Sequence, residues 1–222
     1  MSCDGAKQII VAGVSISTIV ASLASIYFTQ FASRATDLAL HRGVGQVMAE
    51  ETARLLGDKG KVIVMAIDPG AAPELPTQLE SFKETIARLG GIAIEDTVFV
   101  DTENKPKYGT GRGLSARRFL SVVKKSAGVD GIVSFVGAPH LSDADFSELE
   151  RTRLPKFIAE SGSAAKLKRL FDKKVLQVAV VARYQFPAPL RTEPKTDREW
   201  FEKRFQIVTA ETAATLPGPG AE

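Results

Sequence analysis

Lys61–Ile67 reads KVIVMAI, and this stretch indicates the fold class most directly. After its lysine the stretch is entirely apolar and rich in β-branched side chains, which is typical of a strand covered on both faces. Such strands occur in parallel sheets whose crossover helices lie above and below the sheet. The stretch therefore predicts an α/β fold.

Strand-like and helix-like segments alternate along the rest of the chain. Further strands are predicted at Ile92–Val100, Gly131–Val136, Lys156–Ala159, Val175–Ala182 and Phe205–Thr209. Helices are predicted at Thr36–Leu56, Leu75–Leu89, Leu114–Ser126, Ala164–Asp172 and Arg198–Lys203. This alternation favours right-handed βαβ units and a Rossmann-like, mostly parallel sheet flanked by helices. We place this domain at residues 34–214 and a disordered tail, rich in Pro and Gly, at 215–222.

Residues 1–33 are expected to form a transmembrane anchor. Gln8–Ser33 carries no charged residue, and the apolar run Ile9–Phe28 would span roughly the 30 Å hydrocarbon core of a bilayer as a helix. A cleaved signal peptide is the alternative, because Ser22–Ala24 resembles a small-x-small cleavage site. The apolar run continues past that site and is longer than the usual secretory segment. We therefore expect an uncleaved, single-pass anchor in the inner (cytoplasmic) membrane.

The hydroxyl residues of this segment form a stripe. They are spaced three and four residues apart, which places them on one helix face: Ser15, Thr18, Ser22, Ser25 and Thr29. Helices associate in lipid through small residues and hydroxyl hydrogen bonds, so the stripe predicts packing against helices of other membrane-protein subunits. The alternative is that these hydroxyls bond back to their own helix.

Composition limits the other partners and the chemistry. The chain has one cysteine, and its two histidines lie far apart in sequence, so we expect no metal, no other cofactor and no catalytic residues. Residues 151–204 contain 14 Lys/Arg against 6 Asp/Glu. This surplus is either a solvated face or a contact for anionic lipid headgroups or an acidic protein surface. No nucleic-acid-binding motif accompanies it, so nucleic acid is not an expected partner.

Gly43–Leu141 resembles the second lobe of type I, sugar-type periplasmic solute-binding proteins. The similar segments are MAEETARLLGDKGKVIVMAIDPG, QLESFKETIARLGGIAIEDTVFVD and VDGIVSFVGAP. Ser81-Phe82 stands where that family has a Gly-Phe pair. The resemblance implies a single-lobe domain that was exported to the periplasm. It carries over no sugar-binding residue, because the first lobe of the family has no counterpart in this sequence.

Two segments that follow predicted strands form a candidate docking edge. Asp68 and Gly70 follow the first strand, and Gly137 and His140 follow the third. Open α/β sheets place their ligand crevice at such carboxyl ends. Asp68 and His140 would form an acid–histidine pair without a nucleophile, and Asp68 has the alternative role of a turn-former. The glycine-rich stretch Tyr108–Gly113 matches neither a Walker motif nor a dinucleotide fingerprint, which favours a surface loop over an anion site.

Two functions from different classes compete. The first hypothesis is a non-catalytic accessory or scaffold subunit of a larger membrane complex, for example a respiratory or photosynthetic one. The alternative is a membrane-tethered solute-binding or sensor module that completes its cleft with another lobe. The positive charges flanking the anchor slightly favour a cytoplasmic domain. The resemblance to exported lobes favours a periplasmic one, which we adopt.

The stripe gives a first testable prediction. Replacing Ser22 and Ser25 with Leu should loosen the complex while leaving membrane insertion intact, because the helix becomes more apolar but its packing face becomes bulkier. Co-purification of partner subunits and carbonate-resistant membrane association measure the two effects separately. Unchanged co-purification of every partner would contradict the packing hypothesis.

Overall fold

The computed structural model describes residues 19, 22, 32–57, 59–68, 70, 72–100, 114–161, 167–183 and 194–215. The chain divides into two compact units, Met1–Ala39 and Leu40–Glu222.

The first unit contains the predicted anchor. Ile19 and Ser22 are helical and exposed, while the other four residues of the hydroxyl stripe lie outside the described residues. Among the described residues, no helix combines the length and the apolar character needed to cross a bilayer. The anchor and its stripe therefore stay predictions. The predicted tail, apart from Thr215, also lies outside the described residues.

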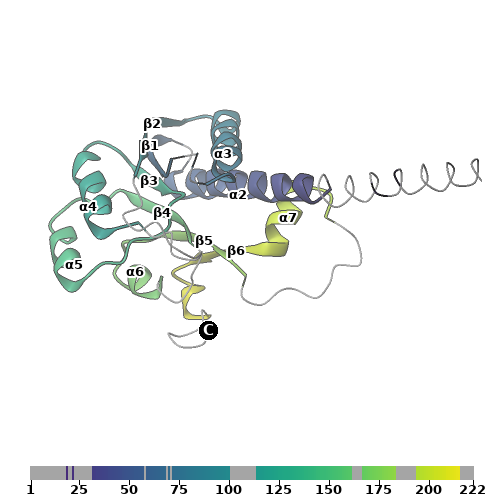
Figure 1. The fold of residues 1–222 in the computed structure, drawn as a ribbon. Helices are drawn as coiled ribbons and strands as arrows, with labels where there is room; N and C mark the ends of the chain where they lie inside the picture. Colours follow the sequence, from purple (N-terminus) through teal and green to yellow (C-terminus); the bar gives the residue numbers. More distant parts are fainter. Residues whose placement is uncertain are drawn as a thin grey trace, which may run out of the picture. The chain divides into compact units, whose positions relative to one another are not determined.

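The second unit is built on one mixed sheet (Figure 1). Its six described strands run in the spatial order β2-β1-β3-β4-β5-β6. They comprise β1 (Gly60–Ala66), β2 (Ile92–Phe99), β3 (Gly131–Ser134), β4 (Lys156–Ser161), β5 (Val178–Ala182) and β6 (Phe205–Thr209). All neighbouring pairs are parallel except β5–β6, which is antiparallel. The predicted α/β fold with a mostly parallel sheet is confirmed.

Helices cover both faces of the sheet. They are α2 (Ala32–Leu56), α3 (Leu75–Leu89), α4 (Ala116–Lys125), α5 (Asp143–Leu149), α6 (Lys168–Asp172) and α7 (Asp197–Arg204), with a short 3₁₀ turn η3 (Ala213–Thr215) after β6. The chain steps from β1 outward to β2 and then back across β1 to β3. Because parallel crossovers are right-handed, α3 lies on one face and α4, α5 and α6 lie on the other. Helix α2 packs against both α3 and α7.

The centre of the sheet is buried. All four residues of β3 are buried, as are Val62–Ala66 of β1, whereas the edge strands β2 and β6 are partly exposed. A bulge at Glu95 interrupts the outer strand β2, because Ile94 pairs with Val62 and the next pair joins Asp96 to Ile63. The Glu95 carboxylate lies 3.0 Å from Lys61 Nζ. A bulged, charged edge strand resists pairing with another chain.

Helix α2 packs unusually close to its neighbours through two glycines. A Cβ atom added at Gly45 would lie 2.2 Å from the carbonyl oxygen of Gln78 in α3, and one added at Gly43 would lie 2.3 Å from that of Asp197 in α7. The Ser81 hydroxyl of α3 donates to the carbonyl of Arg42, and Arg198 of α7 forms an ion pair with Glu50 at 2.6 Å. The segment of α2 from Arg42 to Glu50 is therefore held between two helices.

The element boundaries agree closely with the sequence prediction. Helix Leu75–Leu89 and strand Phe205–Thr209 match to the residue. The strand predicted to begin at Val175 instead begins at Val178, because Lys174 has a left-handed φ of 57° and the chain is still turning there. Helix α5 follows Ser142, whose hydroxyl accepts the Asp145 N–H and caps the helix.

The close packing at Gly45 predicts that a substitution there lowers the free energy of unfolding. Alanine normally stabilises a helix interior by about 1 kcal/mol relative to glycine. Gly45→Ala should instead destabilise the protein by about 1–3 kcal/mol, because the new methyl group overlaps the backbone of α3. Arg42→Ala, an exposed change in the same helix, is the matched control and should stay within about 0.5 kcal/mol of wild type. Urea unfolding measures both, and a Gly45→Ala protein as stable as wild type would disprove the close contact.

Candidate functional site at the carboxyl edge of the sheet

The carboxyl ends of β1 and β3 lie side by side. The two strands pair in parallel from Val62–Gly131 to Met65–Ser134, and the Phe135 N–H donates to the Met65 carbonyl just beyond. Strand β1 is also the point at which the chain reverses its direction across the sheet. In open α/β sheets a crevice forms outside the strand ends at this reversal, because the two connections leave in opposite directions. The structure therefore places the segments containing Asp68 and Gly137 on the two sides of this position.

Asp68 forms a tight turn after β1. Its Oδ1 accepts the Gly70 N–H at 2.7 Å, and both residues are exposed. This Asx-type hydrogen bond is the turn-forming role that was the alternative for Asp68. The turn leaves the carboxylate at the sheet edge, where its charge faces solvent.

The turn after β3 is organised by a buried serine that sequence analysis missed. The Ser134 side chain is fully buried; its hydroxyl donates to the Gly137 carbonyl at 2.8 Å and accepts the Val136 N–H at 3.3 Å. Gly137 has a φ of 112°, which favours glycine. The only sequence signal was a hydroxyl residue three positions before a glycine, which many turns share. Ser134 thus fixes the backbone of the turn that follows β3.

An aromatic contact holds this turn against the neighbouring helix. The Phe135 ring packs edge-on against Phe82 of α3, with ring centroids 5.6 Å apart. Phe82 is fully buried and Phe135 is 8% exposed. The β3 turn therefore cannot move without disturbing the core beneath α3.

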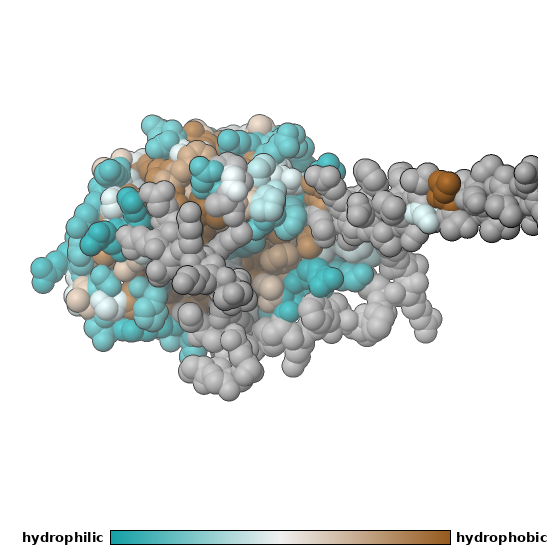
Figure 2. All heavy atoms as spheres, viewed as in Figure 1, coloured by the Kyte–Doolittle hydropathy of each residue, from teal (hydrophilic) through white to brown (hydrophobic). Residues whose placement is uncertain are grey.

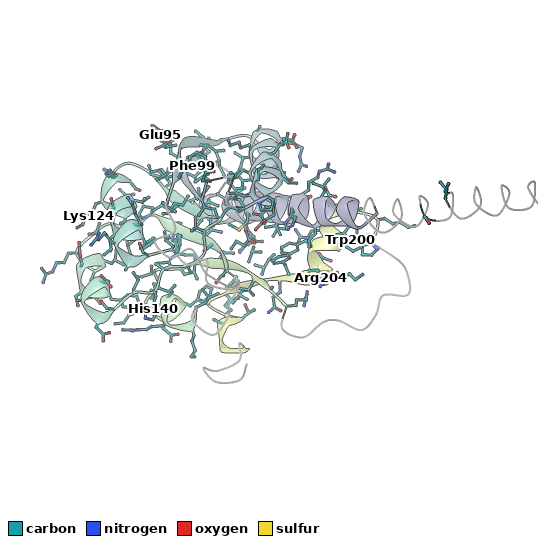
Figure 3. The ribbon with its side chains drawn as sticks, in the orientation of Figure 1. Glu95, Phe99, Lys124, His140, Trp200 and Arg204 are labelled. Atoms are coloured by element: carbon teal, nitrogen blue, oxygen red, sulfur yellow. The ribbon has the colours of Figure 1, made fainter. Side chains whose placement is uncertain are left out.

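His140 lies further along the same loop, three residues beyond Gly137, and is exposed (Figure 3). Among the described residues no hydrogen bond or ion pair joins Asp68 to His140. The two residues share a sheet edge without forming an acid–histidine pair. The role of Asp68, Gly70, Gly137 and His140 in docking a partner stays a prediction.

The loop from β3 ends in a strong helix cap. The Asp145 carboxylate accepts both the hydroxyl and the N–H of Ser142, at 2.6 and 2.8 Å. The hydrogen bond from the Ser142 hydroxyl and then that from its backbone N–H lower the pKa of Asp145, because both favour the charged form. This reciprocal cap fixes the start of α5 and therefore the length of the loop that crosses the edge.

One further carboxylate lies near the end of β4. Glu160 accepts a hydrogen bond from Gln78 Nε2 at 3.3 Å, and Gln78 itself is buried on α3.

Figure 2 shows hydrophobic residues gathered around β1 and β2 and hydrophilic ones over α4 and α5. Within the described ranges, no three His, Cys, Asp or Glu side chains are placed to hold a metal ion. The glycine-rich stretch Tyr108–Gly113 lies outside the described residues.

Comparison with known proteins identifies the fold. No protein-family model and no curated protein sequence matches the chain. Similar solved structures include a sugar-binding protein of a sugar ABC transporter from Bacillus halodurans (TM-score 0.54, 17% identity, 80% of this chain and 64% of that one). Another is an ABC transporter solute-binding protein from Burkholderia graminis in complex with D-arabinose (TM-score 0.53, 16% identity, 81% and 62%). A third is the fructose-binding periplasmic domain of a hybrid two-component system (TM-score 0.51, 13% identity, 79% and 58%).

These similarities show that the α/β domain has the fold of periplasmic sugar-binding proteins. At 13–17% identity they establish the fold alone. The chain spans 58–64% of the length of these structures. The resemblance noted in the sequence is thus confirmed at the level of fold, while its assignment to the second lobe stays a prediction.

Ser134 supplies the testable prediction for this site. Ser134→Ala should cost about 1–3 kcal/mol of stability, because it leaves the Gly137 carbonyl and the Val136 N–H buried without their partner. Ser147→Ala, which removes an exposed hydroxyl bonded to its own helix, should cost no more than about 0.5 kcal/mol. Thermal unfolding compares the two variants. Equal stability would show that Ser134 does not hold the turn.

Proposed function

We propose that this protein is a membrane-tethered solute-binding or sensor module whose ligand crevice lies between the carboxyl ends of β1 and β3. The proposed ligand class is a sugar or a similarly hydroxyl-rich solute. The observation that carries the proposal is the position of the Asp68 and Gly137 turns at the strand reversal of a sheet with the fold of sugar-binding proteins. Of the two hypotheses drawn from the sequence, this similarity favours the solute-binding module over the scaffold subunit.

The proposed module completes its crevice with another lobe. Asp68 and Gly70 are exposed at the edge, so a ligand held there alone would remain largely in water. Each ligand hydrogen bond then contributes only about 0.5–1.5 kcal/mol to binding. Association costs at least about 4 kcal/mol, because the ligand loses translational and rotational freedom. A few such bonds without burial therefore leave the affinity no better than roughly millimolar. A second lobe would bury the ligand and strengthen every contact.

The proposed module is not an enzyme and lies outside the cytoplasm. The similar proteins are described as binding proteins, and one of them is described as a periplasmic domain. Among the described residues Asp68 is bonded to no histidine or nucleophile, and its hydrogen bond with the Gly70 N–H forms a turn. We therefore propose a non-catalytic, extracytoplasmic domain attached to the inner membrane by residues 1–33.

A ligand screen on the full chain in detergent or nanodiscs tests this function. D-arabinose, D-fructose, D-galactose and D-ribose are titrated calorimetrically, and native mass spectrometry reports the oligomeric state with and without each sugar. We expect saturable binding that coincides with formation of a dimer or of a complex with a lobe-bearing protein. Absence of sugar binding in every oligomeric state, with blue-native co-migration among other membrane subunits, would overturn the module in favour of the scaffold hypothesis.

A charge-neutral substitution locates the crevice. Asp68→Asn keeps an oxygen that can accept the Gly70 N–H, so the turn and the melting temperature should be preserved. The loss of a charged hydrogen-bond acceptor should weaken sugar binding by about 10-fold or more. Asp172→Asn, an exposed carboxylate at the end of α6, is the matched control and should bind as wild type. If both variants bound sugar with the same affinity, the binding site would not include the β1 turn.

A further inference from the structure

Helices α4, α5 and α6 all end at the amino edge of the sheet, at the opposite ends of the strands from Asp68. The chain passes from these helices into the neighbouring parallel strands β3, β4 and β5, whose starts lie about 5 Å apart. Lys124 Nζ at the end of α4 lies 2.6 Å from the Glu148 carboxylate at the end of α5, so these two helix ends are side by side. Figure 3 labels Lys124 in this part of the unit, away from Trp200 and Arg204 of α7.

Exposed basic side chains gather along this edge. Two of them have contacts with α5: Lys124 pairs with Glu148, and Lys173 Nζ lies 5.9 Å from the centre of the Phe146 ring. Five others form no ion pair with a described residue, and we call them the amino-edge cations: Lys125, Arg151, Arg153, Lys156 and Lys174. The exposed carboxylates on the same segments, besides Glu148, are those of Asp130, Glu150 and Asp172. The edge therefore carries a surplus of positive charge.

Backbone contacts hold the segments that carry these cations next to one another. The Lys156 N–H donates to the Asp130 carbonyl at 2.8 Å, which joins the start of β4 to that of β3. The Gln177 side chain joins β4 to the segment before β5, because its Oε1 accepts the Phe157 N–H at 2.6 Å and its Nε2 donates to the Lys174 carbonyl at 2.7 Å. The cations on the connections into β4 and β5 are thus presented by fixed backbone.

Helix ends account for only some of these cations. A basic residue in or just after the last turn offsets the partial negative charge of the terminal carbonyls, which suits Lys125 of α4 and Lys174 after α6. Arg153 and Lys156 lie beyond α5, in the connection and at the first position of β4. The helix ends therefore do not explain why this connection is basic.

We propose that the amino-edge cations bind an acidic segment of a partner protein. The arginine guanidinium matches a carboxylate with two parallel hydrogen bonds, and three strand starts spanning about 10 Å correspond to three or four residues of an extended chain. Segments that lie on a membrane also insert large apolar side chains. Among the described residues, the connections into β3, β4 and β5 expose none, which favours a protein partner over lipid. The partner would not compete with a ligand, because the proposed crevice lies at the other ends of the strands.

A matched pair of variants tests the proposal in the full chain in neutral detergent. The probe is a fluorescein-labelled peptide of six Glu-Gly repeats, whose binding is measured by fluorescence anisotropy at low salt. Arg151→Gln/Arg153→Gln neutralises two amino-edge cations, whereas Lys83→Gln/Arg88→Gln neutralises two exposed cations of α3. Because an exposed ion pair changes an equilibrium by up to about 5-fold, the first variant should weaken binding by about 3- to 25-fold. The second should bind as wild type, and both should keep the melting temperature.

Chemical cross-linking locates the bound peptide independently of affinity. A water-soluble carbodiimide couples a carboxylate to a lysine amine that it contacts, and mass spectrometry identifies the lysine. We expect adducts on Lys125, Lys156 and Lys174, and their loss at high salt, which screens exposed charges. Lys83 of α3 is the internal control and should stay unmodified. Adducts spread equally over Lys83 and the edge lysines would overturn the proposal.

The remaining outcomes identify the kind of partner. No binding of the peptide to wild type, or equal weakening in both variants, would overturn the proposal, because the second result reflects only the net charge of the chain. Dioctanoyl phosphatidylglycerol is titrated as a soluble lipid. If it bound, lost affinity only in Arg151→Gln/Arg153→Gln and the peptide did not bind, the partner would be lipid and not protein. Each of these results leaves the proposed sugar binding at the carboxyl edge to be judged by its own titrations.

Discussion

The close packing of α2 against α3 and α7 is the constraint on which the second unit depends. Two helices approach α2 so closely at Gly43 and Gly45 that their backbone carbonyls occupy the space of a side chain. A hydrogen bond from the Ser81 hydroxyl to the Arg42 carbonyl joins α3 to α2, and the ion pair between Arg198 and Glu50 joins α7 to α2. Because α3 follows β1 and α7 precedes β6, the packing joins the start of the sheet to its last strand. The helix that leads into the domain is thereby a part of its core.

The same arrangement positions the proposed binding edge. The chain leaves β1 in one direction across the sheet and returns to β3 on the other side, so the two connections diverge at the carboxyl ends of these strands. Two local turns shape that edge: the Asp68 carboxylate bonds the Gly70 N–H, and the buried Ser134 hydroxyl bonds the Gly137 carbonyl. Phe135 packs the second turn onto α3. The edge therefore carries a charge on the β1 side, and the turn on its β3 side is held by buried contacts.

The sequence predicted the fold of this protein better than its function. The scaffold hypothesis drew on the lone lobe, the hydroxyl stripe and the surplus of positive charge in residues 151–204. The similarity to sugar-binding proteins shows the fold of the domain, and the solute-binding alternative is the function that we propose from it. The surplus of positive charge counted along the sequence does not lie on one surface, because α6 and α7 carry basic residues on different parts of the unit. Arg169 of α6 is also paired with Asp143 of α5. Only the placement of each side chain distinguishes a paired charge from one available to a partner.

The sequence by itself determined the α/β class, the parallel strands and most element boundaries, because these follow from local patterns. An unbroken apolar run such as KVIVMAI signals a doubly covered strand, and a hydroxyl such as Ser142 before an acidic helix start signals a cap. Only the tertiary structure decided the spatial order of the strands, the antiparallel pairing of β6 and the roles of Gly43, Gly45 and Ser134. Those features depend on contacts between residues far apart in the chain, and nothing in the neighbouring sequence records which backbone will approach a glycine.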